Sequence, residues 1–207
     1  MFSFYDRYIL PRLTNLACGT GDISRQRAAL VPQAQGVVLE VGMGTGLNVP
    51  FYDPAKVSRI IGIEPDAGMR ALGRDRYLAA GMPIEVLPAG GEDLPLEDNI
   101  ADTALLTYTM CTIPDVEAAL AEIHRVLKPG GRVLFSEHGR SKDKGIARWQ
   151  DRITPLWKRV AGGCHLNRDP VALLRKNGFK IERVERTYLS PYARVLTYNS
   201  RGSARPR

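Results

Sequence analysis

Three glycines at alternate positions follow a short apolar run in the segment LEVGMGTGLN. Gly42, Gly44 and Gly46 stand there two, four and six residues after Glu40. Glycine is free at positive φ and has no Cβ, so a chain that leaves a strand through such residues can pass close to a ligand. The third glycine comes one residue earlier than in the G-x-G-x-x-G pattern of dinucleotide-binding loops, which argues against a pyrophosphate ligand. The spacing predicts the floor of a binding site.

A carboxylate ends the next apolar run, in RIIGIEPD, where Glu64 is followed by Pro65. If the two runs are neighbouring parallel strands, their carboxyl ends lie side by side at one edge of the sheet. A carboxylate at that edge can accept hydrogen bonds from both hydroxyls of a ribose. Either signal alone is common, but the two in register predict a site for a nucleoside-containing cofactor.

A scaffold of alternating strands and helices is needed to bring these residues together. Apolar runs of strand length lie at Gly36–Val41, Arg59–Ile63, Ile84–Leu87, Ile100–Thr107 and Arg132–Ser136. Apolar residues recur at helical spacing in Ala67–Ala80 and Val116–Leu127. Such alternation requires crossover connections, and it predicts an α/β fold with a doubly wound, mostly parallel sheet.

The pattern loosens in the final third of the chain. A helix is expected over Ile146–Val160, kinked or split at Pro155, and a shorter helix opens at Asp169-Pro170. The runs Phe179–Val184 and Ala193–Tyr198 have no helix between them. We therefore expect them to pair as an antiparallel C-terminal hairpin.

The length of 207 residues, 44% of them hydrophobic and 25% charged, favours a single domain. We expect an N-terminal amphipathic segment at 1–30, a cofactor-binding core at 36–138, acceptor-side helices and the hairpin at 139–199, and a flexible tail at 200–207. No window has the apolar length of a membrane-spanning helix, and the start of the chain does not have the pattern of a secretory signal. The cysteines include no CxxC pair, which favours a reducing, cytoplasmic location.

Basic residues are concentrated in the final third. Residues 1–137 hold 12 basic and 17 acidic residues, a net charge of −5. Residues 138–207 hold 17 basic and 5 acidic residues, a net charge of +12, which makes the whole chain +7. This asymmetry fits nucleic acid, an anionic membrane surface or an anionic substrate, and equally a solvated face. The region has no aromatic platform for single-stranded nucleic acid, which argues against that partner.

The order of motifs resembles the class I S-adenosylmethionine-dependent methyltransferases, specifically the type 11 methyltransferase domain. The resemblance covers residues 36–138 and rests on LEVGMGTGLN, IGIEPD, AGGEDLPLEDNIADTALLTYTMCTIPD and LKPGGRVLFSEH. It implies a Rossmann-like, seven-stranded sheet with a reversed last hairpin, and S-adenosylmethionine as the cofactor. It also implies that Glu40 and the glycine loop hold the methionine end of the cofactor and that Glu64 and Pro65 hold its ribose.

Two later segments match positions that contact the cofactor in this family. Gly91, Glu92 and Asp93 match the segment beside adenine, although Gly90 stands where many members have aspartate. The resemblance further implies that Met110 and Cys111 line the edge of the cofactor that faces the methyl acceptor. Methionine and cysteine are both often buried in protein cores without any contact to a ligand, so a purely structural role fits this pair as well.

The segment EHGRSKDKGIARWQDRITPLWKRVAGGCHLNRD resembles the C-terminal part of methyltransferase-like proteins that methylate alkyl thiols. The resemblance implies a small lipophilic thiol as the acceptor. Methyl transfer from a sulfonium is an in-line displacement that we expect to need no metal. A cation or base near the acceptor raises its thiolate fraction, and the candidates for that catalytic role are His138, His165 and Arg168.

Aromatic residues mark two more segments near the expected acceptor site. Trp149 and Trp157 lie eight residues apart and either line a lipophilic pocket or pack their helix onto the sheet. The amphipathic start, with Phe2, Phe4 and Tyr8, is expected to act as a lid over the cofactor. Peripheral attachment to a membrane surface is the minority interpretation of that segment.

Other acceptors fit the shared core. The chain is compatible with O- or N-methylation of a quinone, a phenol or a phospholipid headgroup. Its cysteines Cys18, Cys111 and Cys164 also fit an arsenite methyltransferase. An RNA methyltransferase or RNA-binding protein is disfavoured, because YTMCTIPD replaces the D/N-P-P-Y/F motif of enzymes that methylate flipped bases. No motif indicates an oligomeric state.

Overall fold

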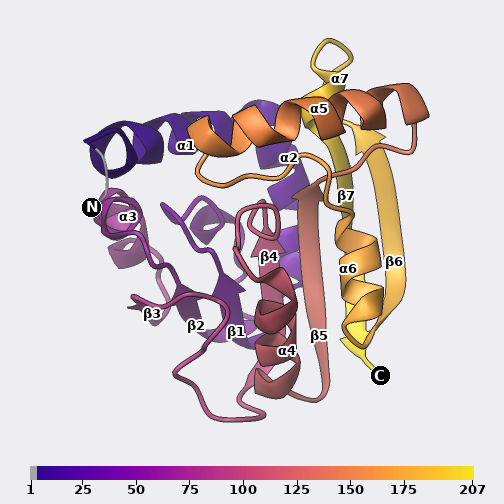
Figure 1. The fold of residues 1–207 in the computed structure, drawn as a ribbon. Helices are drawn as coiled ribbons and strands as arrows, with labels where there is room; N and C mark the ends of the chain where they lie inside the picture. Colours follow the sequence, from indigo (N-terminus) through magenta and orange to yellow (C-terminus); the bar gives the residue numbers. More distant parts are fainter. Residues whose placement is uncertain (1–3) are drawn as a thin grey trace.

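A seven-stranded sheet forms the centre of the protein, seen here in a computed structural model that describes residues 4–207 (Figure 1). Its strands are β1 (Gly36–Val41), β2 (Val57–Ile63), β3 (Ile84–Leu87), β4 (Ala101–Thr107), β5 (Leu127–His138), β6 (Phe179–Tyr188) and β7 (Tyr198–Pro206). They lie in the order β3-β2-β1-β4-β5-β7-β6, and only the two pairs made by β7 are antiparallel. This confirms the predicted doubly wound α/β fold with an antiparallel C-terminal hairpin.

Helices cover both faces of the sheet and one of its edges (Figure 1). They are the π-helical turn η1 (Tyr5–Ile9), α1 (Leu10–Cys18), α2 (Gly21–Leu30), α3 (Ala67–Leu78), α4 (Val116–Val126), α5 (Lys144–Val160), α6 (Pro170–Lys176) and α7 (Arg194–Thr197), with 3-10 turns η2 (Val31–Gln33) and η3 (Val49–Phe51). One face is packed by Leu120 and Leu174 of α4 and α6, and the other by Leu30 at the end of α2. Within the described residues, no helix has the length and apolar character needed to cross a bilayer.

Aspartate caps begin the helices that flank the site. Asp115 accepts a hydrogen bond from a backbone N–H in the first turn of α4, and Asp143 and Asp169 do the same for α5 and α6. The predicted start of α6 at Asp169-Pro170 is therefore confirmed. Pro155 does not split α5, which continues from Lys144 to Val160. The proline removes one backbone N–H donor from the hydrogen bonds of the helix. Next to it, the Thr154 hydroxyl donates a hydrogen bond to the Gln150 carbonyl over 2.7 Å.

The C-terminal strand differs from the sequence prediction. Residues 193–198 were expected to be a strand, but most of them form the short helix α7, and the segment predicted to be a flexible tail forms β7. β7 lies between β5 and β6, where Ser200, Gly202 and Ala204 are buried. A Cβ on Gly202 would lie 2.0 Å from the Arg183 carbonyl oxygen. Gly202 therefore has no room for a side chain, and Ser200, Ser203 and Ala204 are also small, so the strand lacks the large apolar side chains by which strands are recognised.

We expect Gly202→Val to destabilise the protein by more than about 3 kcal/mol, because the added side chain collides with the backbone of β6, the strand paired with β7. Ser203→Val is the matched control, since Ser203 is half-buried on the opposite face and valine is favoured in strands. Urea unfolding of both variants measures the difference. Equal stability of the two variants would contradict the placement of β7 between β5 and β6.

Candidate active site

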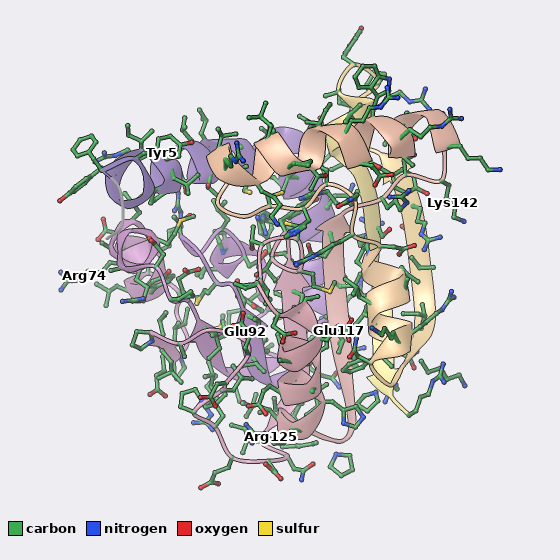
Figure 2. The ribbon with its side chains drawn as sticks, viewed as in Figure 1. Tyr5, Arg74, Glu92, Glu117, Arg125 and Lys142 are labelled. Atoms are coloured by element: carbon green, nitrogen blue, oxygen red, sulfur yellow. The ribbon has the colours of Figure 1, made fainter. Side chains whose placement is uncertain are left out.

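A cavity of about 850 Å³ opens at the edge of the sheet where the carboxyl ends of β1, β2, β4 and β5 meet. Residues of α1 and of the C-terminal end of α5 also line it, and both helices lie across this edge (Figure 1). The Tyr5 hydroxyl donates to the Val160 carbonyl over 2.6 Å, which ties the N-terminal turn to the end of α5 (Figure 2). Lid closure by residues 1–30 stays a prediction, and Phe2 lies outside the described residues.

The glycine loop after β1 forms the floor of this cavity. Gly42, Gly44 and Gly46 have φ values of 71°, 59° and 74°, so all three adopt the left-handed backbone for which glycine is favoured. A Cβ on Gly42 would lie 2.0 Å from Thr109 Oγ1, whereas a Cβ on Gly44 would meet nothing nearer than 3.9 Å. Gly44 thus opens onto the cavity, while Gly46 lies against Tyr77 outside its lining.

Glu64 lies beside the loop at the end of β2. Its Oε2 accepts a hydrogen bond from the Gly44 amide over 2.8 Å, and its Oε1 accepts one from the Asp66 amide over 2.9 Å. The side chain lines the cavity, and burial raises the pKa of its carboxyl group. Each carboxylate oxygen has a further lone pair, so Glu64 can still accept hydrogen bonds from ligand hydroxyls. Pro65 does not line the cavity.

A buried polar network supports the loop from behind. Glu40 is 1% exposed and accepts hydrogen bonds from Asn48 Nδ2 over 2.8 Å and from the Tyr52 hydroxyl over 2.5 Å. Arg27 of α2 donates to Asn48 Oδ1 and to Thr107 Oγ1, both over 2.8 Å. Arg27 and Asn48 line the cavity but Glu40 does not, so Glu40 acts through Asn48. The sequence analysis missed Arg27, because one arginine in a polar helix carries no recognisable signal.

Other residues predicted to contact the cofactor lie away from the cavity lining. Gly91, Glu92 and Asp93 do not line the cavity, and Glu92 accepts a weak hydrogen bond from the Asp115 amide at the start of α4 (Figure 2). Met110 is 1% exposed within the core, whereas the adjacent Cys111 lines the cavity. The cavity lining also includes Thr45, Asp66 and Met69, which belong to no motif recognised in the sequence.

Two cysteines and a histidine converge at one end of the cavity. The ligand atoms of Cys111, His138 and Cys164 all lie within 4.8 Å of one another, and His138 Nε2 is 3.2 Å from Cys164 Sγ. All three residues line the cavity. The contacts with Cys111 and His138 outweigh burial and lower the pKa of the Cys164 thiol. Burial opposes charge on His138, but the contact with Cys164 raises its pKa.

His165 and Arg168 hold the backbone of this cluster rather than facing the cavity. The His165 amide donates to the Cys111 carbonyl over 2.8 Å, and His165 Nδ1 lies 3.1 Å from the same oxygen. Arg168 Nη1 donates to the Met110 and Ile113 carbonyls, each over 2.7 Å. Of the three candidates for the catalytic role, only His138 lines the cavity.

The two tryptophans of α5 have different surroundings. Trp157 lines the cavity and packs against the cluster of buried residues Cys111, Cys164 and Leu166. Trp149 is 56% exposed and does not line the cavity. The eight-residue spacing therefore does not place both rings in one pocket, and only Trp157 is available to contact an acceptor.

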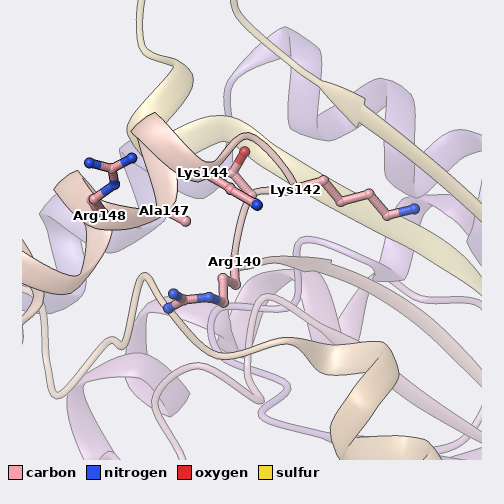
Figure 3. Close-up of a pocket in the computed structure, with 6 residues that line it drawn as sticks. Arg140, Lys142, Lys144, Ala147 and Arg148 are labelled. Atoms are coloured by element: carbon pink, nitrogen blue, oxygen red, sulfur yellow. The ribbon is translucent and has the colours of Figure 1, made fainter.

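The basic C-terminal third forms a separate, shallower pocket of about 390 Å³ near the start of α5. Figure 3 shows that the charged groups of Arg140, Lys142 and Arg148 diverge instead of converging on one point. Arg140 pairs with Asp151 over 2.6 Å, and carboxylates of β6 pair with Arg201 and Arg205 of β7. This pairing favours the solvated-face interpretation of the basic charge.

Comparison with known proteins identifies the relatives of this chain. Residues 39–135 match the family described as a methyltransferase domain. The chain is 30% identical over 155 residues to the thiol S-methyltransferase TMT1B of Rattus norvegicus, covering 72% of this chain and 62% of that protein. It is 31% identical over 134 residues to the ubiquinone/menaquinone biosynthesis C-methyltransferase UbiE of Brucella abortus, covering 60% of this chain and 49% of the relative.

The fold is shared with solved methyltransferase structures. Geranyl diphosphate methyltransferase in complex with S-adenosylmethionine superimposes with a TM-score of 0.70 at 14% sequence identity, covering 89% of this chain and 85% of that one. At this identity the similarity shows a common fold.

The buried Glu40 carboxyl group makes stability depend on pH. Burial raises its pKa to about 7 from an ordinary value of 4.5, so the folded protein holds a proton that the unfolded chain loses between these pH values. Stability is therefore lost as pH rises from about 4.5 to 7, by up to about 3 kcal/mol. We expect Glu40→Gln to reduce the loss of urea-derived stability over this window without abolishing it, because burial also raises the pKa of Glu137 to about 7. Glu85→Gln, which removes an exposed carboxylate, should leave the slope unchanged. An unaltered slope in Glu40→Gln would contradict this assignment.

Proposed function

The chain belongs to the S-adenosylmethionine-dependent methyltransferases, and from this premise we propose that it methylates the sulfur of a small lipophilic thiol. The chain spans 62% of the length of the rat thiol methyltransferase, so both the acceptor and the whole protein's activity belong to the proposal. The observation that carries it is the Cys111–His138–Cys164 cluster at one end of a single cavity, with the glycine loop and Glu64 also in its lining. The similarity to thiol methyltransferases supports the same acceptor.

The residues around Gly44 fit the cofactor. The space left by the absent Cβ of Gly44 opens onto the cavity, and Glu64 is available to ribose hydroxyls beside it. The Arg27 guanidinium lines the same cavity and carries a buried Nε without a partner in the described chain, which suits a ligand carboxylate. When bound, S-adenosylmethionine supplies an electrophilic methyl group on a sulfonium centre.

Positioning is the main contribution of the protein to the reaction. The acceptor sulfur must lie on the line of the S–CH₃ bond, so that a new S–C bond forms as the old one breaks. Leu166 and Trp157 give the acceptor end an apolar wall, while α1 and the end of α5 cover the cavity and exclude water. The proton of the acceptor thiol must leave before or during transfer, and His138 is the catalytic candidate that faces it.

A carbon, oxygen or nitrogen acceptor is the second candidate. This candidate is favoured by the similarity to UbiE, whose name specifies C-methylation in quinone biosynthesis. That similarity covers 60% of this chain. The second candidate differs from the first proposal at the acceptor end only, because both reactions use the cofactor half of the cavity in the same way. A direct test of acceptor class therefore separates them.

We expect Gly44→Val to weaken binding of S-adenosylmethionine at least about tenfold, because the branched side chain enters the open space at the loop. Glu64→Ala removes the carboxylate that would accept hydrogen bonds from the ribose hydroxyls, each worth about 1.5–3 kcal/mol, and should have a similar effect. Gly81→Val is the matched control, since Gly81 also has positive φ and open space but does not line the cavity. Isothermal titration with S-adenosylmethionine gives the three Kd values. Unchanged Kd in both Gly44→Val and Glu64→Ala would contradict the cofactor site.

The acceptor class is tested with labelled S-adenosylmethionine and a panel of alkyl thiols, aryl thiols, phenols, quinols, amines and arsenite. We expect label in the thioethers and none in the other products, with activity rising for more lipophilic thiols because the acceptor end is apolar. Label in a phenol, quinol or amine, with none in the thiols, would show that the second candidate is correct.

A further inference from the structure

The Cys111–His138–Cys164 cluster has the donor set of a metal site. Its ligand atoms come from the loop after β4, the last residue of β5 and the turn after α5, and they lie within 4.8 Å of one another. We propose that these three side chains bind one Zn²⁺ ion and leave a fourth coordination position open toward the cavity. This departs from the expectation, drawn from the sequence, that the enzyme needs no metal, because only the fold brings these three side chains together.

The chemistry of these ligands matches zinc. Thiolate sulfur and imidazole nitrogen are preferred zinc ligands, and three protein ligands with one open position are typical of catalytic zinc sites. Tetrahedral bonds of about 2.3 Å to sulfur and 2.0–2.1 Å to nitrogen separate neighbouring ligand atoms by about 3.6–3.8 Å. His138 Nε2 and Cys164 Sγ, 3.2 Å apart, would have to separate by about 0.4 Å, and no pair in the cluster, all within 4.8 Å, would have to close by more than about 1 Å. Two thiolates also neutralise the charge of Zn²⁺, which suits burial.

The surrounding structure holds the ligands in place before any ion binds. His165 and Arg168 fasten the loop that carries Cys111 to the segment that carries Cys164, through backbone carbonyl groups. His138 is fixed by its place in the sheet, where it pairs with Asn199 of β7. Isolated buried cysteines are commonly just small apolar side chains. Here two sulfur atoms and a ring nitrogen point to one place at a cavity wall, which packing alone does not require.

This site deepens the proposed function and, for its fourth ligand, rests on it. A thiol acceptor that enters the open position would bind as a thiolate and release its proton to bulk solvent, because coordination deprotonates thiols. His138 would then act as a zinc ligand and not as the base that accepts this proton. The thiolate sulfur then forms the S–C bond as the S–CH₃ bond of the cofactor breaks, which yields a thioether and S-adenosylhomocysteine. A thioether is a neutral and weaker ligand, so the product leaves the ion.

Metal binding is tested without any acceptor. The full chain, kept reduced with a phosphine and stripped with a chelator, is titrated with Zn²⁺ against a chromophoric competitor. We expect one equivalent bound with Kd below about 1 μM, as structural and catalytic zinc sites bind tightly. The Co²⁺-substituted protein should show thiolate-to-metal charge-transfer absorption and the intense visible bands of four-coordinate cobalt.

The variants separate this site from adventitious binding. Cys164→Ser, Cys111→Ser and His138→Gln should each weaken Zn²⁺ binding at least about 100-fold, with circular dichroism reporting that they fold. Cys18→Ser and His124→Gln are the matched controls, because both change the same residue types outside the cluster, and they should keep one equivalent. Less than a fifth of an equivalent in the wild-type chain, or equal binding in Cys164→Ser, would overturn the proposal. Binding of arsenite but not Zn²⁺ would also overturn it and indicate a metalloid substrate.

The role in acceptor activation has its own readout. Adding an alkyl thiol to the Co²⁺ protein should shift the charge-transfer absorption, since a third sulfur joins the ion, and an alcohol of the same chain length should not shift it. No shift with any thiol that the enzyme methylates would refute activation by the metal while leaving thiol methylation established. A metal-binding protein that methylates no thiol would instead refute the proposed function and leave the zinc site in place.

Discussion

The parallel alignment of four neighbouring strands is the constraint on which the cavity depends. Val41 at the end of β1 pairs with Ile63 of β2 and with Leu106 of β4, and Thr107 pairs with Ser136 of β5. Because these hydrogen-bonded ladders end at one edge, the loops that follow them begin side by side. The glycine loop, Glu64, Cys111 and His138 therefore meet without needing direct contacts to specify their positions.

Buried polar groups then shape the half of the cavity that contains the glycine loop. Arg27, Asn48 and Glu40 link α2, the loop after the glycines and β1 through hydrogen bonds in the interior. Such a network is costly when any member lacks a partner, and it selects a single arrangement when satisfied. The raised pKa of Glu40 shows that its hydrogen bonds do not fully offset the burial of its charge. The wall of the cavity is thus held by polar contacts as well as by packing.

The end of the cavity at which we propose that the acceptor binds is held together in a different way. Three segments that are not adjacent in sequence supply Cys111, His138 and Cys164, and side chains that bind backbone carbonyls hold those segments together. His165 and Arg168 have the residue types of catalytic groups, yet their polar atoms are used to fix the loop after β4. An apolar shell that includes Leu166 and Trp157 surrounds the cluster. In such surroundings electrostatic interactions are strong, so the charge state of the two sulfur atoms depends on the charged or polar groups next to them.

Local signals in the sequence determined the α/β fold and the glycine loop after β1. The glycines need positive φ whatever surrounds them, and strands such as β1 and β3 have apolar runs that are visible in the chain itself. The tertiary structure alone decided β7, because the glycine at 202 is explained by the close approach of the Arg183 backbone in β6. It also decided the cysteine–histidine cluster, because Cys111 and Cys164 lie 53 positions apart and a search for CxxC spacing detects only ligands that are close along the chain. Chain spacing reports local backbone requirements, whereas contacts between distant loops arise only when the sheet aligns their ends.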